Sequence, residues 1–266
     1  MISLLKEDRM RSLRAWLGEF AADFDALLFP TECAACGIES GSAVFCGECE
    51  EKLLAGAGDA CERCASRLGP WSRSDDGLCR WCRGRRLGFD AAFALGPYSE
   101  PLRTLCLRVK HPTDGWLARR LIDLLMKARR DAIERAIGVR PHYLGGFAPL
   151  VVPVPLHRLR NWTRGYNQAE AYARRLAAVL GIRYENALRR VVATPKLAGL
   201  SRTERAEVMR EAFGVRPGYD KHVRGRVIAL VDDVMTSGAT CDSAARTLKQ
   251  AGATRVVVVV IGRTDI

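Results

Sequence analysis

The sequence predicts an α/β fold, in which a parallel sheet carries helices on both faces and a small cysteine-rich module comes before it. Two observations predict this organisation. Eight of the ten cysteines stand between Cys33 and Cys82, in a stretch poor in aliphatic residues. From residue 91 onward, β-branched apolar runs alternate with segments of helical periodicity, a pattern typical of sheets buried on both sides. The 266 residues, 48% of them hydrophobic, are enough for two modest domains.

Residues 1–28 form the first expected element, an amphipathic helix. Apolar side chains recur there at helical spacing, and Pro30 ends the pattern. We expect the apolar face to dock on the protein's own body, and binding to a membrane surface is the alternative. Because charged residues interrupt the segment throughout, it does not read as a secretory signal. The sequence therefore predicts a cytoplasmic protein without a transmembrane segment.

Residues 29–90 form the cysteine-rich module. Its eight cysteines stand as four C-x2-C pairs, separated by 9, 11 and 14 residues. In a reducing compartment such pairs are typical of metal ligands, and two pairs complete the tetrahedral four-sulfur site of structural zinc. We expect sequential pairing; interleaved pairing, an iron–sulfur cluster and redox-active thiols are the alternatives. The expected ligands are Cys33, Cys36, Cys46 and Cys49 at one site and Cys61, Cys64, Cys79 and Cys82 at the other.

The remaining domain, residues 91–266, begins with alternating strands and helices. Short apolar runs predict strands over 91–95 and 150–154. Apolar residues at helical spacing predict helices over 114–136 and 168–180, and Gly181 ends the second of them in a C-terminal cap position. A strand, a helix and a further strand in this order are typical of a parallel sheet.

The last part of the chain predicts one βαβ unit. Continuous apolar runs over 227–231 and 256–261 predict two buried strands, and the segment 243–251 between them predicts a helix capped by Gly252. Asp232 and Asp233 follow the first strand, and the hydroxyl-rich turn 236–240 comes next. The ligand crevice of an open α/β sheet lies at the carboxyl ends of its strands, so these residues mark the expected site.

This turn has the chemistry of a phosphate site. It offers backbone amides, three hydroxyls and a helix N-terminus, and Gly238 lets the backbone approach a ligand closely. The two carboxylates suit ribose hydroxyls, either directly or through a hydrated Mg²⁺. The alternative is that the two acids only cap the following helix.

The run from Val227 to Thr240 resembles the signature by which type I phosphoribosyltransferases bind phosphoribosyl pyrophosphate (PRPP). That signature consists of four apolar residues, two acids and two further residues, followed by a [Ser/Thr]-[Ser/Thr]-Gly-x-Thr turn. In this chain the turn is Thr-Ser-Gly-Ala-Thr, at 236–240. The stretches Val-Pro-Val-Pro-Leu at 152–156 and Arg-Gly-Tyr-Asn-Gln at 164–168 are similar to the first strand and loop of the ComF family. That family joins a zinc module to a phosphoribosyltransferase domain, and the resemblance covers nearly the whole chain.

The resemblance implies a role for each matching residue. Asp232 and Asp233 would be catalytic carboxylates at the ribose hydroxyls, and residues 155–164 would correspond to the pyrophosphate loop. Each arginine of that loop, taken alone, also fits a solvated surface charge. The residues that would bind PRPP are Thr236, Ser237, Gly238, Ala239 and Thr240 at the 5-phosphate, and Arg158, Arg160, Arg164 and Lys110 as candidate cations.

Two positions depart from the family pattern. Leu197 stands where a glutamine is expected, and Val208 stands where an asparagine is expected. Both belong to the segment that would cover the site as a hood. These departures concern the binding of the acceptor and not the PRPP turn.

The charge balance leaves several functions open. The net charge is +12, and 35 of the 42 basic residues are arginines, which bind phosphate through a planar fork. One hypothesis is a phosphoribosyltransferase, a pentosyl-transferring glycosyltransferase with zinc, Mg²⁺ and an unknown acceptor. The alternatives are a competence protein that handles single-stranded DNA during DNA uptake, and a PRPP-responsive adaptor that docks a protein partner through its zinc module. The aromatic residues are few and not interleaved with the arginines, which argues against a stacking platform for DNA bases.

Overall fold

The computed structural model describes residues 32–69, 77–139, 147–156, 166–191 and 212–264. Its contacts form two compact units, residues 1–52 and 53–266. The first unit contains the first four cysteines, and helix α2 (Gly47–Ala55) begins in it. The second contains the last four cysteines together with the whole sheet. The helix expected over 1–28 lies outside the described residues.

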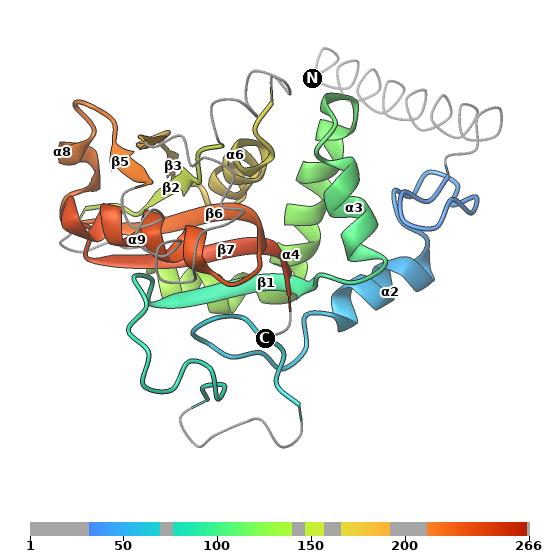
Figure 1. Cartoon of the computed structure of the whole chain (residues 1–266). Coiled ribbons are helices and arrows are strands. Elements are labelled where there is room, and N and C mark those ends of the chain that lie inside the picture. The colour runs from blue at the N-terminus through green and yellow to red at the C-terminus, as the bar shows by residue number, and fades with distance from the viewer. Residues whose placement is uncertain (1–31, 70–76, 140–146, 157–165, 192–211, 265–266) are drawn as a thin grey trace, which may run out of the picture. The chain divides into compact units, whose positions relative to one another are not determined.

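A five-stranded sheet forms the centre of the larger unit (Figure 1). The strand order is β1-β7-β6-β2-β3, and all neighbouring strands are parallel. This arrangement confirms the parallel sheet predicted from the apolar runs. The strands are β1 (Ala91–Pro97), β2 (Leu150–Pro153), β3 (Arg183–Tyr184), β6 (Val227–Met235) and β7 (Arg255–Arg263).

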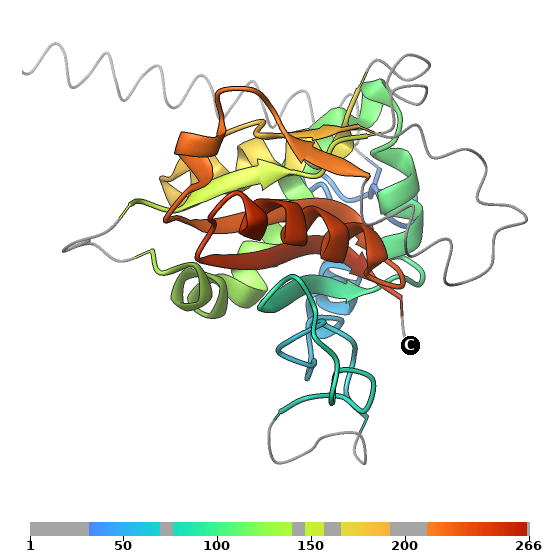
Figure 2. The same cartoon turned by 60° about the vertical axis from the view of Figure 1, so that its left-hand side comes forward.

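Helices cover both faces of the sheet, as predicted (Figure 2). Helices α4 (Gly115–Ile137) and α6 (Gln168–Leu180) pack on one face, and α9 (Ala239–Gln250) packs on the other. Successive strand residues point to opposite faces, so each valine of β7 meets one helix layer. Burying such a side chain contributes about 1.5–3 kcal/mol, which makes β7 the centre of the core. The α9 face brings together Val256, Val258 and Val260 of β7 with Ala244, Ala245 and Leu248 of α9.

The strands and helices predicted from residue 91 onward are present, but two boundaries near the acids were wrong. Strand β6 continues to Met235, so Asp232 and Asp233 lie within its last half and not beyond its end. Val234 and Met235 still pair with β7, which explains the longer strand. Helix α9 begins at Ala239 and not at residue 243, because Gly238 adopts φ +78° and turns the chain directly into the helix.

Several short elements were not predicted. Helix α3 (Leu102–Arg108), the 3₁₀ turn Pro112–Asp114 and helix α8 (Asp220–Val223) are too short to show a helical period. Strand β4 (Leu188–Arg190) pairs antiparallel with β5 (Phe213–Val215), and 22 residues separate the two strands along the chain. Among the described helices, none is both long and apolar enough to cross a membrane.

Candidate phosphate turn and metal centres

The predicted phosphate turn joins β6 to α9 at the carboxyl end of the sheet. Thr236 and Ser237 are exposed, and Gly238 is the N-cap residue in the left-handed conformation. The first backbone bond of α9 runs from the amide of Asp242 to the carbonyl of Gly238, over 2.8 Å. The amides before Asp242 therefore precede the hydrogen-bond ladder of α9, and such amides are the usual donors to a bound anion.

Asp232 and Asp233 lie immediately before this turn and interact with each other. The amide of Asp233 donates to Oδ1 of Asp232 over 2.8 Å, and the amide of Val234 donates to Oδ1 of Asp233 over 2.7 Å. Burial and the neighbouring charge of Asp233 raise the pKa of the Asp232 carboxyl well above its usual range. Two carboxylates held this close would be stabilised by a cation between them or by donors from a ligand.

The start of α6 lies beside the acids. Asn167 caps this helix, because its Oδ1 accepts from the amide of Ala169 over 3.1 Å. The next residue, Gln168, is buried, and its Nε2 lies 3.4 Å from Oδ2 of Asp233. The structure thus places Gln168, at the end of the ComF-like stretch 164–168, beside the carboxylate of Asp233. Three of the candidate PRPP-binding cations, Arg158, Arg160 and Arg164, lie outside the described residues. The two positions that depart from the family pattern, Leu197 and Val208, lie outside them as well.

Lys110 lies two residues after the end of α3. The pKa of the buried Cys106 thiol, on α3, depends on both Asp233 and Lys110. Burial and the charge of Asp233 raise this pKa and the charge of Lys110 lowers it, which gives a pKa of about 12. Among the described residues, no hydrogen bond or ion pair joins Lys110 to Asp232 or Asp233. Its role as a PRPP ligand stays a prediction.

Arg263, which the sequence analysis missed, lies under the phosphate turn. It ends β7, is only 1% exposed, and donates through Nη1 to the carbonyls of Met235 (2.8 Å) and Thr236. Its Nε donates to the carbonyl of Cys64 over 2.8 Å. The only signal in the sequence was a basic residue at the end of a long apolar strand, which would more often mark a solvated end.

The eight cysteines form two groups, and each group has the geometry of a four-sulfur zinc site. Within each group the sulfur atoms all lie within 4.8 Å of one another. The pairs Cys36–Cys46 and Cys64–Cys79 lie 3.8 Å and 3.6 Å apart. A tetrahedral site with Zn–S bonds of about 2.3 Å has sulfur–sulfur edges of about 3.8 Å, so zinc fits both groups. The grouping is the predicted sequential one, and the interleaved alternative is excluded.

Backbone amides support each group from outside. The amide of Cys46 donates to Sγ of Cys33, and the amide of Cys79 donates to Sγ of Cys61, each over 3.3 Å. Burial would raise the pKa of Cys33, but the amides of Cys46, Cys36 and Ala35 outweigh it and lower the pKa to about 6. Amides that favour thiolate are the usual outer support of a metal-bound cysteine.

The second cysteine group is fastened to the sheet. The amide of Ala92 in β1 donates to the carbonyl of Glu62 over 3.2 Å, and Arg129 of α4 donates to the carbonyl of Gly58 over 2.6 Å. On the α9 side, Arg246 donates to the carbonyl of Arg86 over 2.6 Å. Together with the Arg263 bond, these bonds attach the module to β1, α4, α9 and β7.

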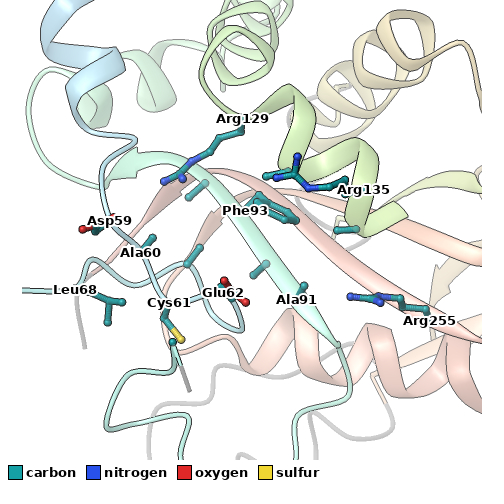
Figure 3. A pocket seen from close by; sticks show the side chains of 16 residues that line it. Asp59, Ala60, Cys61, Glu62, Leu68, Ala91, Phe93, Arg129, Arg135 and Arg255 are labelled. Atoms are coloured by element: carbon teal, nitrogen blue, oxygen red, sulfur yellow. The ribbon is translucent and has the colours of Figure 1, made fainter. Parts of the chain in front are cut away.

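Between these attachments the contact is interrupted by a cavity of about 470 Å³. Figure 3 shows Phe93 of β1 in the middle of this cavity, with Arg129 and Arg135 of α4 on one side and Cys61 of the module on the other. The second cysteine group is therefore not packed continuously against β1.

Comparisons with known proteins agree with this architecture. Residues 25–83 match the family model of the double zinc ribbon domain. Over 215 residues the chain is 32% identical to Competence protein F of Haemophilus influenzae, which covers 80% of this chain and 88% of that protein. The chain belongs to the ComF family. In this ComF protein the two cysteine groups lie within the residues that match the double zinc ribbon.

Other relatives cover a similar part of this ComF chain. DNA utilization protein YhgH of Salmonella typhimurium and of Escherichia coli are each 28% identical over 205 residues, which is 77% of this chain and 78% of those proteins. Among solved structures, the glutamine PRPP amidotransferase of B. subtilis complexed with ADP and GMP matches with a TM-score of 0.32 and 20% identity. That match covers 54% of this chain and 26% of the other.

Proposed function

We propose that this ComF protein binds PRPP at the β6–α9 turn and transfers its phosphoribosyl group to an acceptor. The observation that carries the proposal is the juxtaposition of three features at one end of the sheet. These are the amides that precede the hydrogen-bond ladder of α9, the Asp232–Asp233 pair, and Gln168 against Asp233. A 5-phosphate at the turn would place the ribose hydroxyls over the two carboxylates.

The reaction would be a substitution at C1 of the ribose. The bond between C1 and pyrophosphate breaks, the bond between C1 and the acceptor forms, and the acceptor loses a proton. The chain's own residues would fix the 5-phosphate and the ribose, and this positioning is the main contribution to such a transfer. The oxygen-rich donor set of Asp232 and Asp233 fits Mg²⁺, which would neutralise charge on the pyrophosphate.

Calorimetric titration with PRPP and Mg²⁺ tests this proposal. The wild type is expected to bind, and the Asp232→Asn/Asp233→Asn variant is expected to lose the binding heat. A matched control, Asp131→Asn/Glu51→Gln, removes two exposed carboxylates elsewhere and should bind as the wild type does. Circular dichroism of all three proteins shows that they are folded. Absence of binding by the folded wild type would overturn the proposal, and binding would justify a screen of acceptors for pyrophosphate release.

A second candidate function, the handling of single-stranded DNA, is supported by the last knuckle of the second ribbon. Arg80, Arg83 and Arg85 are exposed around the partly buried Trp81, and the guanidinium of Arg85 lies 4.6 Å from the centre of the Trp81 ring. Trp81 is therefore an aromatic residue interleaved with arginines, contrary to the expectation from the sequence. An indole with surrounding cations is a surface on which an unpaired base can stack. The names of the relatives, Competence protein F and DNA utilization protein YhgH, agree with this function.

Fluorescence anisotropy with a labelled oligothymidine separates the two functions. Trp81→Ala is expected to weaken binding by roughly 10-fold or more, since one stacked base contributes about 1–3 kcal/mol. Trp116→Ala, which removes an exposed tryptophan of α4, is the matched control. If DNA bound equally well to the Trp81 variant, the knuckle would not be its site. The Asp232→Asn/Asp233→Asn variant should keep its DNA affinity.

A further inference from the structure

Arg263 is the most completely buried charged side chain described in the structure. It is 1% exposed, and no carboxylate within the described residues forms a salt bridge with it. Its hydrogen bonds run instead to backbone carbonyls at three places: Cys64, the Met235–Thr236 pair, and Thr264. A buried cation is costly unless its donors are satisfied, so each of these carbonyls stabilises Arg263 where it stands.

The two ends of the guanidinium reach two different sites. Nε contacts the carbonyl of Cys64, a predicted zinc ligand whose knuckle continues into Ala65 at φ +56°. Nη1 contacts the carbonyls of Met235 and Thr236, the last residue of β6 and the first residue of the phosphate turn. Along the chain, Arg263 lies 199 positions from Cys64 and 28 positions from Met235. One rigid planar group thus connects the second zinc knuckle to the turn.

We propose that Arg263 is a positioning residue that couples the second zinc site to the phosphate turn. The metal fixes the knuckle, the knuckle fixes the carbonyl of Cys64, and that carbonyl orients the guanidinium under Thr236. Because the planar fork is rigid, a displacement of Cys64 moves the donor that holds the turn. Coupling between two sites is reciprocal, so a turn that is held in place also retains metal at the second ribbon.

The other bonds between the second ribbon and the rest of its unit do not connect the ribbon to the phosphate turn. The Ala92–Glu62 and Arg129–Gly58 bonds attach the same ribbon to β1 and α4, but neither touches the turn. The cavity beside Phe93 interrupts the contact in that region. Of the recorded attachments, the Arg263 bonds are the ones that continue from a ribbon carbonyl into carbonyls of the turn.

The test compares Arg263→Met with Arg129→Met by hydrogen exchange, without any ligand. Both changes remove a guanidinium that donates to a ribbon carbonyl, and only the first removes a bond to the turn. Arg263→Met is expected to speed amide exchange in residues 235–241 by about tenfold, the effect of losing one charge-assisted hydrogen bond. Arg129→Met should leave exchange in that segment unchanged. Equal exchange in wild type and a folded Arg263→Met variant would overturn the proposal.

Release of zinc to a chromogenic chelator gives the second readout. Arg263→Met is expected to speed release from the second site about tenfold and leave release from the first unchanged. If this variant does not fold, Arg263→Lys takes its place, because an ammonium keeps the charge but lacks the rigid fork. Faster exchange at the turn with unchanged zinc release, or the reverse, would show that the two sites are not coupled through Arg263.

The ligand side of the coupling rests on the proposed function and is measured separately. If PRPP binds, addition of PRPP and Mg²⁺ should slow zinc release from the second site in the wild type but not in Arg263→Met. If PRPP does not bind, calorimetry shows this directly, and the exchange and release measurements still decide the coupling.

Discussion

The two zinc ribbons use the same ligands in different surroundings. The first has an exposed Cys36 and a partly exposed Cys46, and belongs to the smaller compact unit. In the second ribbon all four cysteines are buried, and they belong to the same unit as the sheet. Four thiols of similar spacing are thus partly exposed in the smaller unit in one case, and fully buried in the unit that contains the sheet in the other. The difference teaches that a ligand motif specifies the metal, whereas its neighbours decide what the metal stabilises.

The largest expected effect is the loss of one ligand from each ribbon. Cys64→Ser should destabilise the whole larger unit by on the order of 5 kcal/mol, because metal binding contributes directly to folding and Arg263 loses its fixed partner. Cys36→Ser should release one zinc and leave the unfolding temperature of the sheet nearly unchanged. Thermal unfolding followed by circular dichroism, with zinc content per chain, checks both. Equal destabilisation by the two variants would remove the distinction between the ribbons.

A smaller effect is expected from the attachment of the second ribbon to α9. A Cβ at Gly88 would lie 2.6 Å from the carbonyl oxygen of Asp242 and 2.7 Å from Cγ of Arg246. Gly88→Ala should therefore cost about 1–3 kcal/mol, since backbone must shift to accommodate it. A Cβ at Gly47, at the start of α2, meets nothing within 4 Å, so Gly47→Ala is the matched control. Urea denaturation measures both, and a neutral Gly88→Ala would show that the ribbon is not held tightly there.

The sequence predicted the parts of this comparison that depend on local pattern. Spacing alone indicated the cysteine ligands, and the valine runs of β6 and β7 indicated a buried parallel sheet, because both signals lie within a few residues. The sequential grouping was expected as the simplest pairing, and only the structure decided it. The turn 236–240 was placed correctly after β6, although α9 begins four residues earlier than its apolar period suggested.

What the sequence could not show depends on contacts between distant residues. In the sequence, Arg263 stands out only as the last residue of an apolar strand. Its contact with the second ribbon is made with Cys64, which lies 199 positions away in the chain. Gln168 approaches Asp233 only because β2 and β6 are neighbours in the sheet. The different burial of Cys36 and Cys64 likewise follows from packing and not from spacing. Such features need the register of the sheet, which no single segment contains.

The smallest expected effect is a gain in stability from Asp232→Asn. Because the folded protein raises the pKa of this carboxyl, the native state holds its proton more tightly than the unfolded chain does. The stability contributed by the bound proton is full below the unfolded pKa of about 4 and is lost as the pH rises through the raised folded pKa. At neutral pH the carboxylate therefore destabilises the fold, and an amide removes that penalty while keeping the oxygen that accepts from Asp233.

Thermal unfolding of Asp232→Asn and wild type across the pH range measures this gain. The unfolding temperature of the variant should exceed that of wild type by about 2–4 °C at neutral pH, the shift that ~1 kcal/mol produces in a domain of this size. The two proteins should converge near pH 4. Since the second ribbon belongs to the same unit as β6, zinc release from the second site should slow in the variant, and release from the first should not. A gain that protected both ribbons equally would show that they are not held in separate units.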